Sequence, residues 1–181
     1  MNLSNKLTLM RVVMILFYVF FQMSNVCGEY GKYIAFAIFL IASITDLLDG
    51  KIARKYNLVT NFGKFMDPLA DKLLVSSALI CFVELGLLPA WMVIIIISRE
   101  FIISGFRLVA ANNGVVIAAS MWGKFKTTFQ MIMICMIILN FDCKYYQYLV
   151  TVITWIAFIL TIISLVDYII KNIDVLKNDN H

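Results

Sequence analysis

Four aspartates, spaced in two pairs, are the residues of this chain whose types and spacing point most directly to chemistry. Asp46 and Asp49 are three residues apart, Asp67 and Asp71 are four apart, and all four lie within 26 residues. On a helix, residues three and four apart share a face, so each pair would present two carboxylates together. Carboxylates that lie close together cannot all stay ionised without a compensating cation. Two adjacent helices of this kind would therefore gather hard oxygen ligands, which favour magnesium, manganese or calcium.

The residues around the first pair suit an anionic ligand beside such a metal. Gly50 and Ala53 have small side chains that let a bulky group approach the backbone, and Arg54 has a planar guanidinium suited to phosphate oxygens. The alternative is that the aspartates only solvate a loop, paired with the basic residues Lys51, Arg54, Lys55, Lys64 and Lys72. A single aspartate near a helix end would favour that alternative. Four at helical spacing, interleaved with glycine and arginine, favour the metal site.

The elements that must position these residues are predicted to lie in a membrane. The chain has 181 residues, of which 62% are hydrophobic and only 14% are charged, and its mean hydropathy is +0.92. So few charged residues can hardly cover the surface of a soluble domain. The four cysteines have no paired or metal-ligand spacing, so we expect free thiols that pack as small hydrophobic residues.

Six apolar runs are long enough, with their polar ends, to be membrane-spanning helices. The runs are continuous rather than alternating, which argues against barrel strands. They are roughly 9–23, 33–48, 69–88, 91–111, 115–139 and 148–170. The sequence thus predicts an all-α membrane protein with six transmembrane helices in a bundle, forming one domain over residues 1–170, and a polar, frayed tail over 171–181. Asp67 and Pro68 are predicted to begin the third helix, as its N-cap and first residue.

Basic residues predict the orientation of these helices. With six spans, one side of the membrane receives the N-terminus, the 49–66 loop, the 112–126 region and the C-terminus. Lysine and arginine are concentrated there, and the other side has only Lys32 and Lys144. The positive-inside rule makes the first side cytoplasmic. We therefore expect a multi-pass protein of the cell membrane whose acidic cluster faces the cytoplasm.

The acidic segment resembles the signature of a known family. The pattern D-x2-D-G-x2-A-R-x8-G-x3-D-x3-D runs without a mismatch from Asp46 to Asp71 and is similar to that of the CDP-alcohol phosphatidyltransferases. More of the chain resembles the branch of this family that uses sn-glycerol 3-phosphate as acceptor. These segments begin at Asn5 and include Arg99-Glu100, Arg107 and the stretch from Ala118 to Gln130. Ser4 departs from the branch, which often has proline there.

The resemblance implies transfer of the phosphatidyl group of CDP-diacylglycerol to sn-glycerol 3-phosphate, giving phosphatidylglycerophosphate and CMP. Two Mg²⁺ or Mn²⁺ ions would be bound by Asp46, Asp49, Asp67 and Asp71, and Asp71 would also be the general base. The binding site for CDP-diacylglycerol would be lined by Thr8, Asp49, Gly50, Ala53, Arg54 and Gly63.

The acceptor carries a phosphate, so a second anion site is required. The candidates are basic residues of the cytoplasmic side: Arg107, Lys124, Arg11 and Lys126. Arg107 lies within an otherwise apolar run, where an uncompensated guanidinium would be costly. Its alternative role is to reach toward lipid phosphates. Arg99 and Glu100 are adjacent on one helix and are expected not to face each other, so each should have a separate partner in a structural polar network.

Other functions remain open at this stage. The aspartate pattern is common to relatives that use inositol phosphate, serine, choline or phosphatidylglycerol as acceptor. Outside the enzyme class, a small membrane transporter would also carry intramembrane acids and arginines. The transporter would place polar residues near the middle of its spans and show repeat symmetry, and this sequence shows no repeat. The resemblance also implies a homodimer in contact with membrane lipid, and we expect no nucleic-acid partner.

Overall fold

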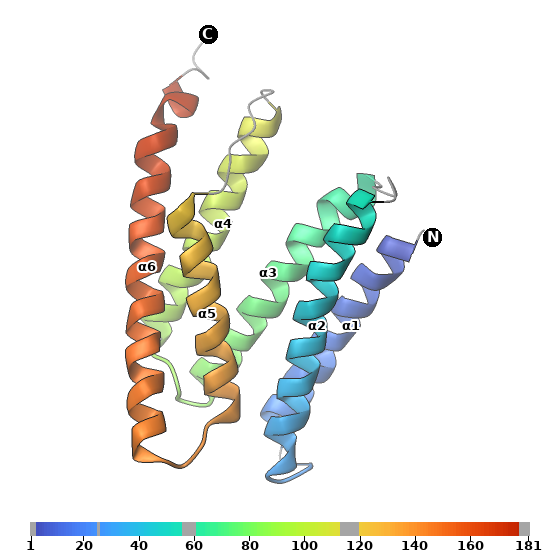
Figure 1. Cartoon of the computed structure of the whole chain (residues 1–181), viewed down its shortest axis with the longest axis vertical. Helices are drawn as coiled ribbons and strands as arrows, with labels where there is room; N and C mark the ends of the chain where they lie inside the picture. Colours follow the sequence, from blue (N-terminus) through green and yellow to red (C-terminus); the bar gives the residue numbers. More distant parts are fainter. Residues whose placement is uncertain (1–2, 25, 56–60, 113–119, 178–181) are drawn as a thin grey trace. The chain divides into compact units, whose positions relative to one another are not determined.

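The chain folds into α-helices throughout the part that its structure describes. The structure is a computed structural model that describes residues 3–24, 26–55, 61–112 and 120–177. Within these ranges it describes the backbone alone, without side chains, for residues 3–7, 46–55, 61–68, 109, 111–112 and 173–177. Six helices follow one another along these ranges (Figure 1). They are α1 (Leu3–Met23), α2 (Tyr30–Lys55), α3 (Asn61–Glu84), α4 (Ala90–Asn112), α5 (Met121–Leu139) and α6 (Lys144–Lys177). The predicted all-helical fold and its six helices are confirmed.

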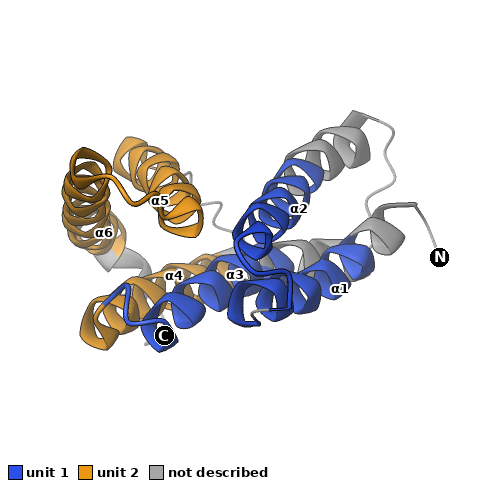
Figure 2. Ribbon diagram, turned by 90° about the horizontal axis from the view of Figure 1, so that it is seen from below, with its two compact units in different colours: residues 1–88 blue, residues 89–181 orange. Residues whose placement is uncertain are grey.

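The helices form two compact units, which Figure 2 distinguishes by colour. The first unit, residues 1–88, contains α1, α2 and α3, and α1 packs against both of the others. The second unit, residues 89–181, contains α4, α5 and α6, and α6 packs against both of the others. The assignment of residues 1–170 to a single domain stays a prediction.

Each helix of the first unit buries one stripe of residues at helical spacing. The buried positions include Ile15 and Tyr18 on α1, Phe39 on α2, and Leu74 and Ala78 on α3. The rings of Tyr18 and Phe39 meet with their centroids 5.7 Å apart. Small residues complete the stripes: Ala35, Ala42 and Ala70 are all fully buried. A stripe of this kind on each helix is the pattern of a three-helix core.

The core of the second unit combines aliphatic and aromatic residues. Met133 and Ile134 on α5 are fully buried, as is Ile96 on α4. Trp91 on α4 packs edge-to-face against Phe158 on α6, with 5.4 Å between the ring centroids. Such aromatic pairs add to the energy of simple area burial. They join α4 to α6 near the beginning of α4.

Local chemistry explains most of the turns. Gly28 and Gly86 have φ angles of +51° and +69°, a region that favours glycine. Pro89 directly precedes α4, and its carbonyl accepts a hydrogen bond from the backbone N–H of Met92. Asn140 ends α5 in the left-handed region, with a φ of 36°. Gly28 and Pro89 thus lie in turns that suit their backbone preferences.

The beginning of α3 differs from the prediction. The helix begins at Asn61, so Asp67 and Pro68 lie inside it and do not form its N-cap and first residue. A proline removes one backbone hydrogen bond and crowds the carbonyl four residues before it. After Pro68 the helix contributes Ala70, Leu74 and Ala78 to the core of the unit. The prediction was wrong because a local preference for a helix start does not exclude a helix that begins earlier.

Two other boundaries also differ. The fifth helix was expected from Val115, but Ser120 is extended and its hydroxyl accepts the backbone N–H of Gly123, so α5 begins at Met121. The tail from residue 171 was expected to fray, yet α6 continues to Lys177 beyond a non-helical residue, Asn172. The side chain of Asn172 donates a hydrogen bond to the carbonyl of Tyr168, so a local bond stabilises this change of backbone direction. Residues 178–181 lie outside the described part.

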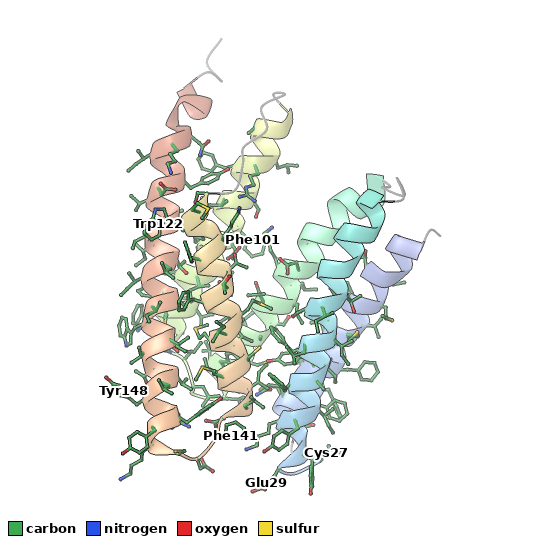
Figure 3. The ribbon with its side chains drawn as sticks, viewed as in Figure 1. Cys27, Glu29, Phe101, Trp122, Phe141 and Tyr148 are labelled. Carbon is green, nitrogen blue, oxygen red and sulfur yellow. The ribbon has the colours of Figure 1, made fainter. Side chains whose placement is uncertain are left out.

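Large apolar side chains cover much of the surface of both units. They include Leu16 on α1, Ile80 on α3 and Ile94 on α4, all more than half exposed. Phe101, Trp122 and Tyr148 are further examples, labelled in Figure 3. Among the described residues, Met121–Leu139 and Lys144–Asn172 are long and apolar enough to cross a membrane, and Thr8–Met23 and Tyr30–Thr45 are shorter apolar helices. Exposed apolar surface on this scale is typical of contact with lipid or another protein.

Candidate functional site

The acidic motif lies on two helices of the first unit that contact each other. Asp46 and Asp49 belong to α2, whereas Asp67 and Asp71 belong to α3. The helical backbone therefore carries each pair at the spacing of one helix face, as expected. The side chains of Asp46, Asp49 and Asp67 lie outside the described residues, as do those of the donor-site candidates Gly50, Ala53, Arg54 and Gly63.

Asp71 is the member of the motif whose side chain is described. It is exposed, although its chain neighbour Ala70 and Leu74 are buried. An exposed carboxylate on the edge of a helix core is accessible to a ligand. Among the described side chains, no three of His, Cys, Asp and Glu come together as a metal site, because three of the four aspartates are outside that set. Metal ligation by this motif thus stays a prediction.

Two polar residues of α1 lie one turn apart inside the same unit. Thr8 and Arg11 are only 1% and 0% exposed. Burying a guanidinium is costly unless anionic or polar groups surround it. The helices packed against α1 are α2 and α3, which carry the aspartates. Thr8 and Arg11 therefore belong to the unit of the acidic motif, and their predicted substrate roles are not tested.

The second unit contains a buried polar cluster that joins its three helices. Arg99 and Glu100 lie on α4, Lys126 on α5 and Ser164 on α6. A guanidinium N–H of Arg99 donates to the hydroxyl of Ser164, and Lys126 forms an ion pair with Glu100. Arg99 and Lys126 are only 7% and 1% exposed. The cluster therefore places two buried cations beside one carboxylate whose side chain is 21% exposed.

The cluster confirms one expectation about Arg99 and Glu100 and corrects another. Each has its own partner on a different helix, as predicted. The two were also expected not to face each other, yet Nη1 of Arg99 lies 3.5 Å from Oε1 of Glu100. Both side chains are long enough to bend toward the same interior, although their Cα positions are adjacent on the helix. The prediction considered the directions of the Cα–Cβ bonds alone.

The four residues predicted to bind the acceptor phosphate differ in solvent exposure. Arg107 on α4 and Lys124 on α5 are exposed, whereas Arg11 and Lys126 are buried. The guanidinium carbon of Arg107 lies 5.9 Å from the centroid of the Tyr168 ring on α6, within the range of a cation–π interaction. Arg107 and Lys124 are thus accessible to a soluble anion, while Lys126 is engaged with Glu100.

The sequence did not lead us to predict a role for several polar residues of α6. Thr154, Thr161, Ser164 and Tyr168 are all buried. They follow one another at spacings of seven, three and four residues, which place them on one face of a helix. That spacing within an otherwise apolar run was a signal that this face of α6 contacts other polar groups. Gln130 on α5 is also buried, and both atoms of its amide lack a hydrogen-bond partner in the described part of the chain.

The helical fold and the motif correspond to a known class of enzyme. The model of the CDP-alcohol phosphatidyltransferase family matches residues 1–163, and the chain belongs to this family. A curated relative from Bacillus subtilis is 45% identical over 99% of both chains and is named CDP-diacylglycerol–glycerol-3-phosphate 3-phosphatidyltransferase. A relative of the same name from Rickettsia bellii is 37% identical over 90% of this chain and 91% of its own. A relative from Mycobacterium tuberculosis, named a probable phosphatidylglycerophosphate synthase, is 40% identical over 94% of this chain and 81% of its own.

Proposed function

We propose that this chain transfers the phosphatidyl group of CDP-diacylglycerol to sn-glycerol 3-phosphate, giving phosphatidylglycerophosphate and CMP. The observation that carries the proposal is near-complete coverage of relatives that bear the name of this reaction, at 37–45% identity. The unbroken pattern from Asp46 to Asp71 supports the same donor chemistry. The exposed positions of the two cations Arg107 and Lys124 support an acceptor that carries a phosphate.

The acidic motif would hold two divalent cations, Mg²⁺ or Mn²⁺, through Asp46, Asp49, Asp67 and Asp71. The donor set fits such ions, because all four ligands are hard carboxylate oxygens on two helices in contact. The bound ions would neutralise charge on the diphosphate and on the leaving CMP. Gly50, Ala53, Arg54 and Gly63 would line the site of the cytidine and diphosphate, with Thr8 helping from α1.

Asp71 is proposed to take the proton from the primary hydroxyl of the acceptor as that oxygen attacks the phosphorus. The new P–O bond forms to the glycerol oxygen, and the bond to the CMP oxygen breaks. The exposure of the Asp71 side chain supports this role, because a general base must reach the acceptor. Arg107 and Lys124 would orient the acceptor by binding its phosphate. Positioning of this kind contributes much of the acceleration in phosphoryl transfer.

All six helices are proposed to cross the membrane, with the acidic motif facing the cytoplasm. Their lengths, from 19 to 34 residues, meet the requirement of about 20 residues for a span. The exposed apolar side chains on both units support contact with lipid. The excess of basic residues on one side supports the orientation. The homodimer implied by the resemblance is part of the proposal.

An assay with a panel of acceptors tests the proposed reaction. Purified protein would be incubated with CDP-diacylglycerol, Mg²⁺ and one acceptor at a time: glycerol 3-phosphate, inositol phosphate, serine or phosphatidylglycerol. We expect CMP release with glycerol 3-phosphate and little with the others. Preferential release with another acceptor would keep the class of enzyme and overturn the substrate. No release with any acceptor, from a folded protein, would contradict the proposed function itself.

The Arg107→Ala variant is expected to raise the apparent KM for glycerol 3-phosphate by about 10- to 100-fold, with a smaller effect on the KM for CDP-diacylglycerol. The reason is the loss of charge-assisted hydrogen bonds to the acceptor phosphate, each worth about 1.5–3 kcal/mol. Steady-state kinetics with each substrate varied in turn measures both constants. A selective rise of the KM for CDP-diacylglycerol would assign Arg107 to the donor. Lys144→Ala, at the beginning of α6, is the matched control for loss of a cation.

A further inference from the structure

Arg107 is exposed, but one face of its guanidinium is defined by an aromatic ring. The guanidinium carbon lies 5.9 Å from the centroid of Tyr168. Tyr168 itself is only 3% exposed, so its ring is a fixed part of the interior of the second unit. A cation over a fixed ring loses part of its rotational freedom and keeps its N–H groups for other partners. The pair therefore resembles a prepositioned anion site more than a freely rotating surface arginine.

The Tyr168 ring packs against a second aromatic ring, and the backbone of Tyr168 accepts a side-chain hydrogen bond. Phe106, the chain neighbour of Arg107, packs edge-to-face against it, with ring centroids 6.2 Å apart and an interplanar angle of 82°. The carbonyl of Tyr168 accepts a hydrogen bond from the side chain of Asn172, where the backbone of α6 leaves the helical region. The hydroxyl of Tyr168 is buried and has no hydrogen-bond partner in the described part of the chain. Buried tyrosines usually have such a partner. The contacts that the structure shows for the Tyr168 side chain are therefore made by its ring and not by its hydroxyl.

The charges around Arg107 also point to an anion. In the part of the second unit that the structure describes, the ion pairs are Glu100 with Arg99 and Lys126, and Asp167 with Lys171. Both carboxylates are thus engaged with other cations. Arg99, eight residues before Arg107 on the same helix, adds a further positive charge to this unit. A phosphate dianion at Arg107 would relieve this excess of positive charge.

We infer that Tyr168 is a positioning residue for the acceptor: its ring holds the Arg107 guanidinium in the orientation that binds the phosphate of the acceptor. The inference rests on the proposed function, and in particular on the role of Arg107. It adds a residue of α6 to the acceptor site, although the last helix carries none of the sequence patterns that indicated this reaction. Tyr168 acts through Arg107 and does not touch the reacting atoms.

Three variants of the full-length chain distinguish the role of the Tyr168 ring from that of its hydroxyl. Tyr168→Leu and Tyr168→Met remove the aromatic face, whereas Tyr168→Phe keeps it. We expect both ring-less variants to raise the KM for glycerol 3-phosphate by about 3- to 30-fold, the range of a partly buried cation–π interaction. The kcat and the KM for CDP-diacylglycerol should stay within about twofold. Tyr168→Phe should match the parent chain in all three constants.

A double variant tests whether the effect passes through Arg107. In the Arg107→Ala background, Tyr168→Leu should add no further rise in the KM for glycerol 3-phosphate. An equal rise in both backgrounds would overturn the inference, as would a loss in Tyr168→Phe as large as in Tyr168→Leu. Thermal unfolding in detergent identifies variants that fail to fold, and Tyr168→Met then replaces Tyr168→Leu. If both fail, Tyr168→Phe still decides, because a raised KM there assigns the role to the hydroxyl and overturns the inference.

The same measurements distinguish failure of this inference from failure of the proposed function. A parent chain that releases no CMP with glycerol 3-phosphate contradicts the proposed function. A parent chain that turns over normally, with an unchanged KM in Tyr168→Leu, contradicts only the role of Tyr168. A changed dependence on the anionic lipid content of the vesicles, with an unchanged KM, would assign the pair to lipid phosphates and would also overturn the inference.

Discussion

The Asp67→Asn variant is expected to release CMP from CDP-diacylglycerol about 1000-fold more slowly than the parent chain. Asparagine keeps the shape of the side chain but removes the charge that would bind a divalent cation. Metal ions contribute several kcal/mol to the stabilisation of charge in phosphoryl transfer, and about 4 kcal/mol corresponds to this loss. CMP release with saturating glycerol 3-phosphate and Mg²⁺ measures it. The variant should extract from membranes and elute as the same folded species as the parent chain.

A matched control and a second variant make the Asp67 result specific. Glu84→Gln removes an exposed carboxylate from the other end of the same helix and should leave CMP release unchanged. Asp71→Asn should lower kcat by about 10²- to 10⁴-fold, the range for loss of a general base. If Asp71 is only a metal ligand, excess Mg²⁺ or Mn²⁺ should recover much of that loss. Near-normal turnover of folded Asp67→Asn would contradict the assignment of the metal site.

The sequence predicted the helical fold and the placement of the acidic motif on two helices, because both depend on local spacing. Continuous apolar runs indicate helices without any knowledge of tertiary contacts. The spacing of Asp46, Asp49, Asp67 and Asp71 along α2 and α3 follows from the same rule. The predicted beginning of α3 was wrong. Asp67 and Pro68 satisfy a local rule for a helix start, but such a rule does not exclude a helix that begins earlier, and α3 begins at Asn61.

The polar interior of the second unit could be predicted only in part. Arg99 and Glu100 were expected to have separate partners, but nothing in the sequence identifies those partners, which lie 65 and 26 residues away along the chain. Lys126 was assigned to the acceptor because it is basic and near the expected cytoplasmic side. Its burial against Glu100 depends on the packing of α4, α5 and α6, which spacing along one helix does not specify. The same holds for the contact between Arg107 and Tyr168.

The ion pair of Lys126 leads to the second large prediction, the loss of stability in Glu100→Gln. Glutamine preserves the volume of the side chain, so no cavity forms. It leaves Lys126 and Arg99, both nearly inaccessible, without their shared carboxylate. Removing the carboxylate partner of buried cations costs about 3–5 kcal/mol. Unfolding in detergent, followed by temperature or denaturant, should show this loss. Asp167→Asn, which breaks the pair with the 62% exposed Lys171, should have a much smaller effect.

A double variant shows whether the pair itself accounts for that loss. Glu100→Leu combined with Lys126→Met replaces both charges with apolar groups of similar size, and such replacements of buried ion pairs are often neutral or stabilising. We expect it to recover most of the stability that Glu100→Gln loses. If it is as unstable as Glu100→Gln, the remaining cation, Arg99, is the group that Glu100 stabilises. The KM for glycerol 3-phosphate in Lys126→Met then decides the role of Lys126. A structural lysine leaves it near the parent value, whereas a direct contact with the acceptor phosphate raises it as in Arg107→Ala.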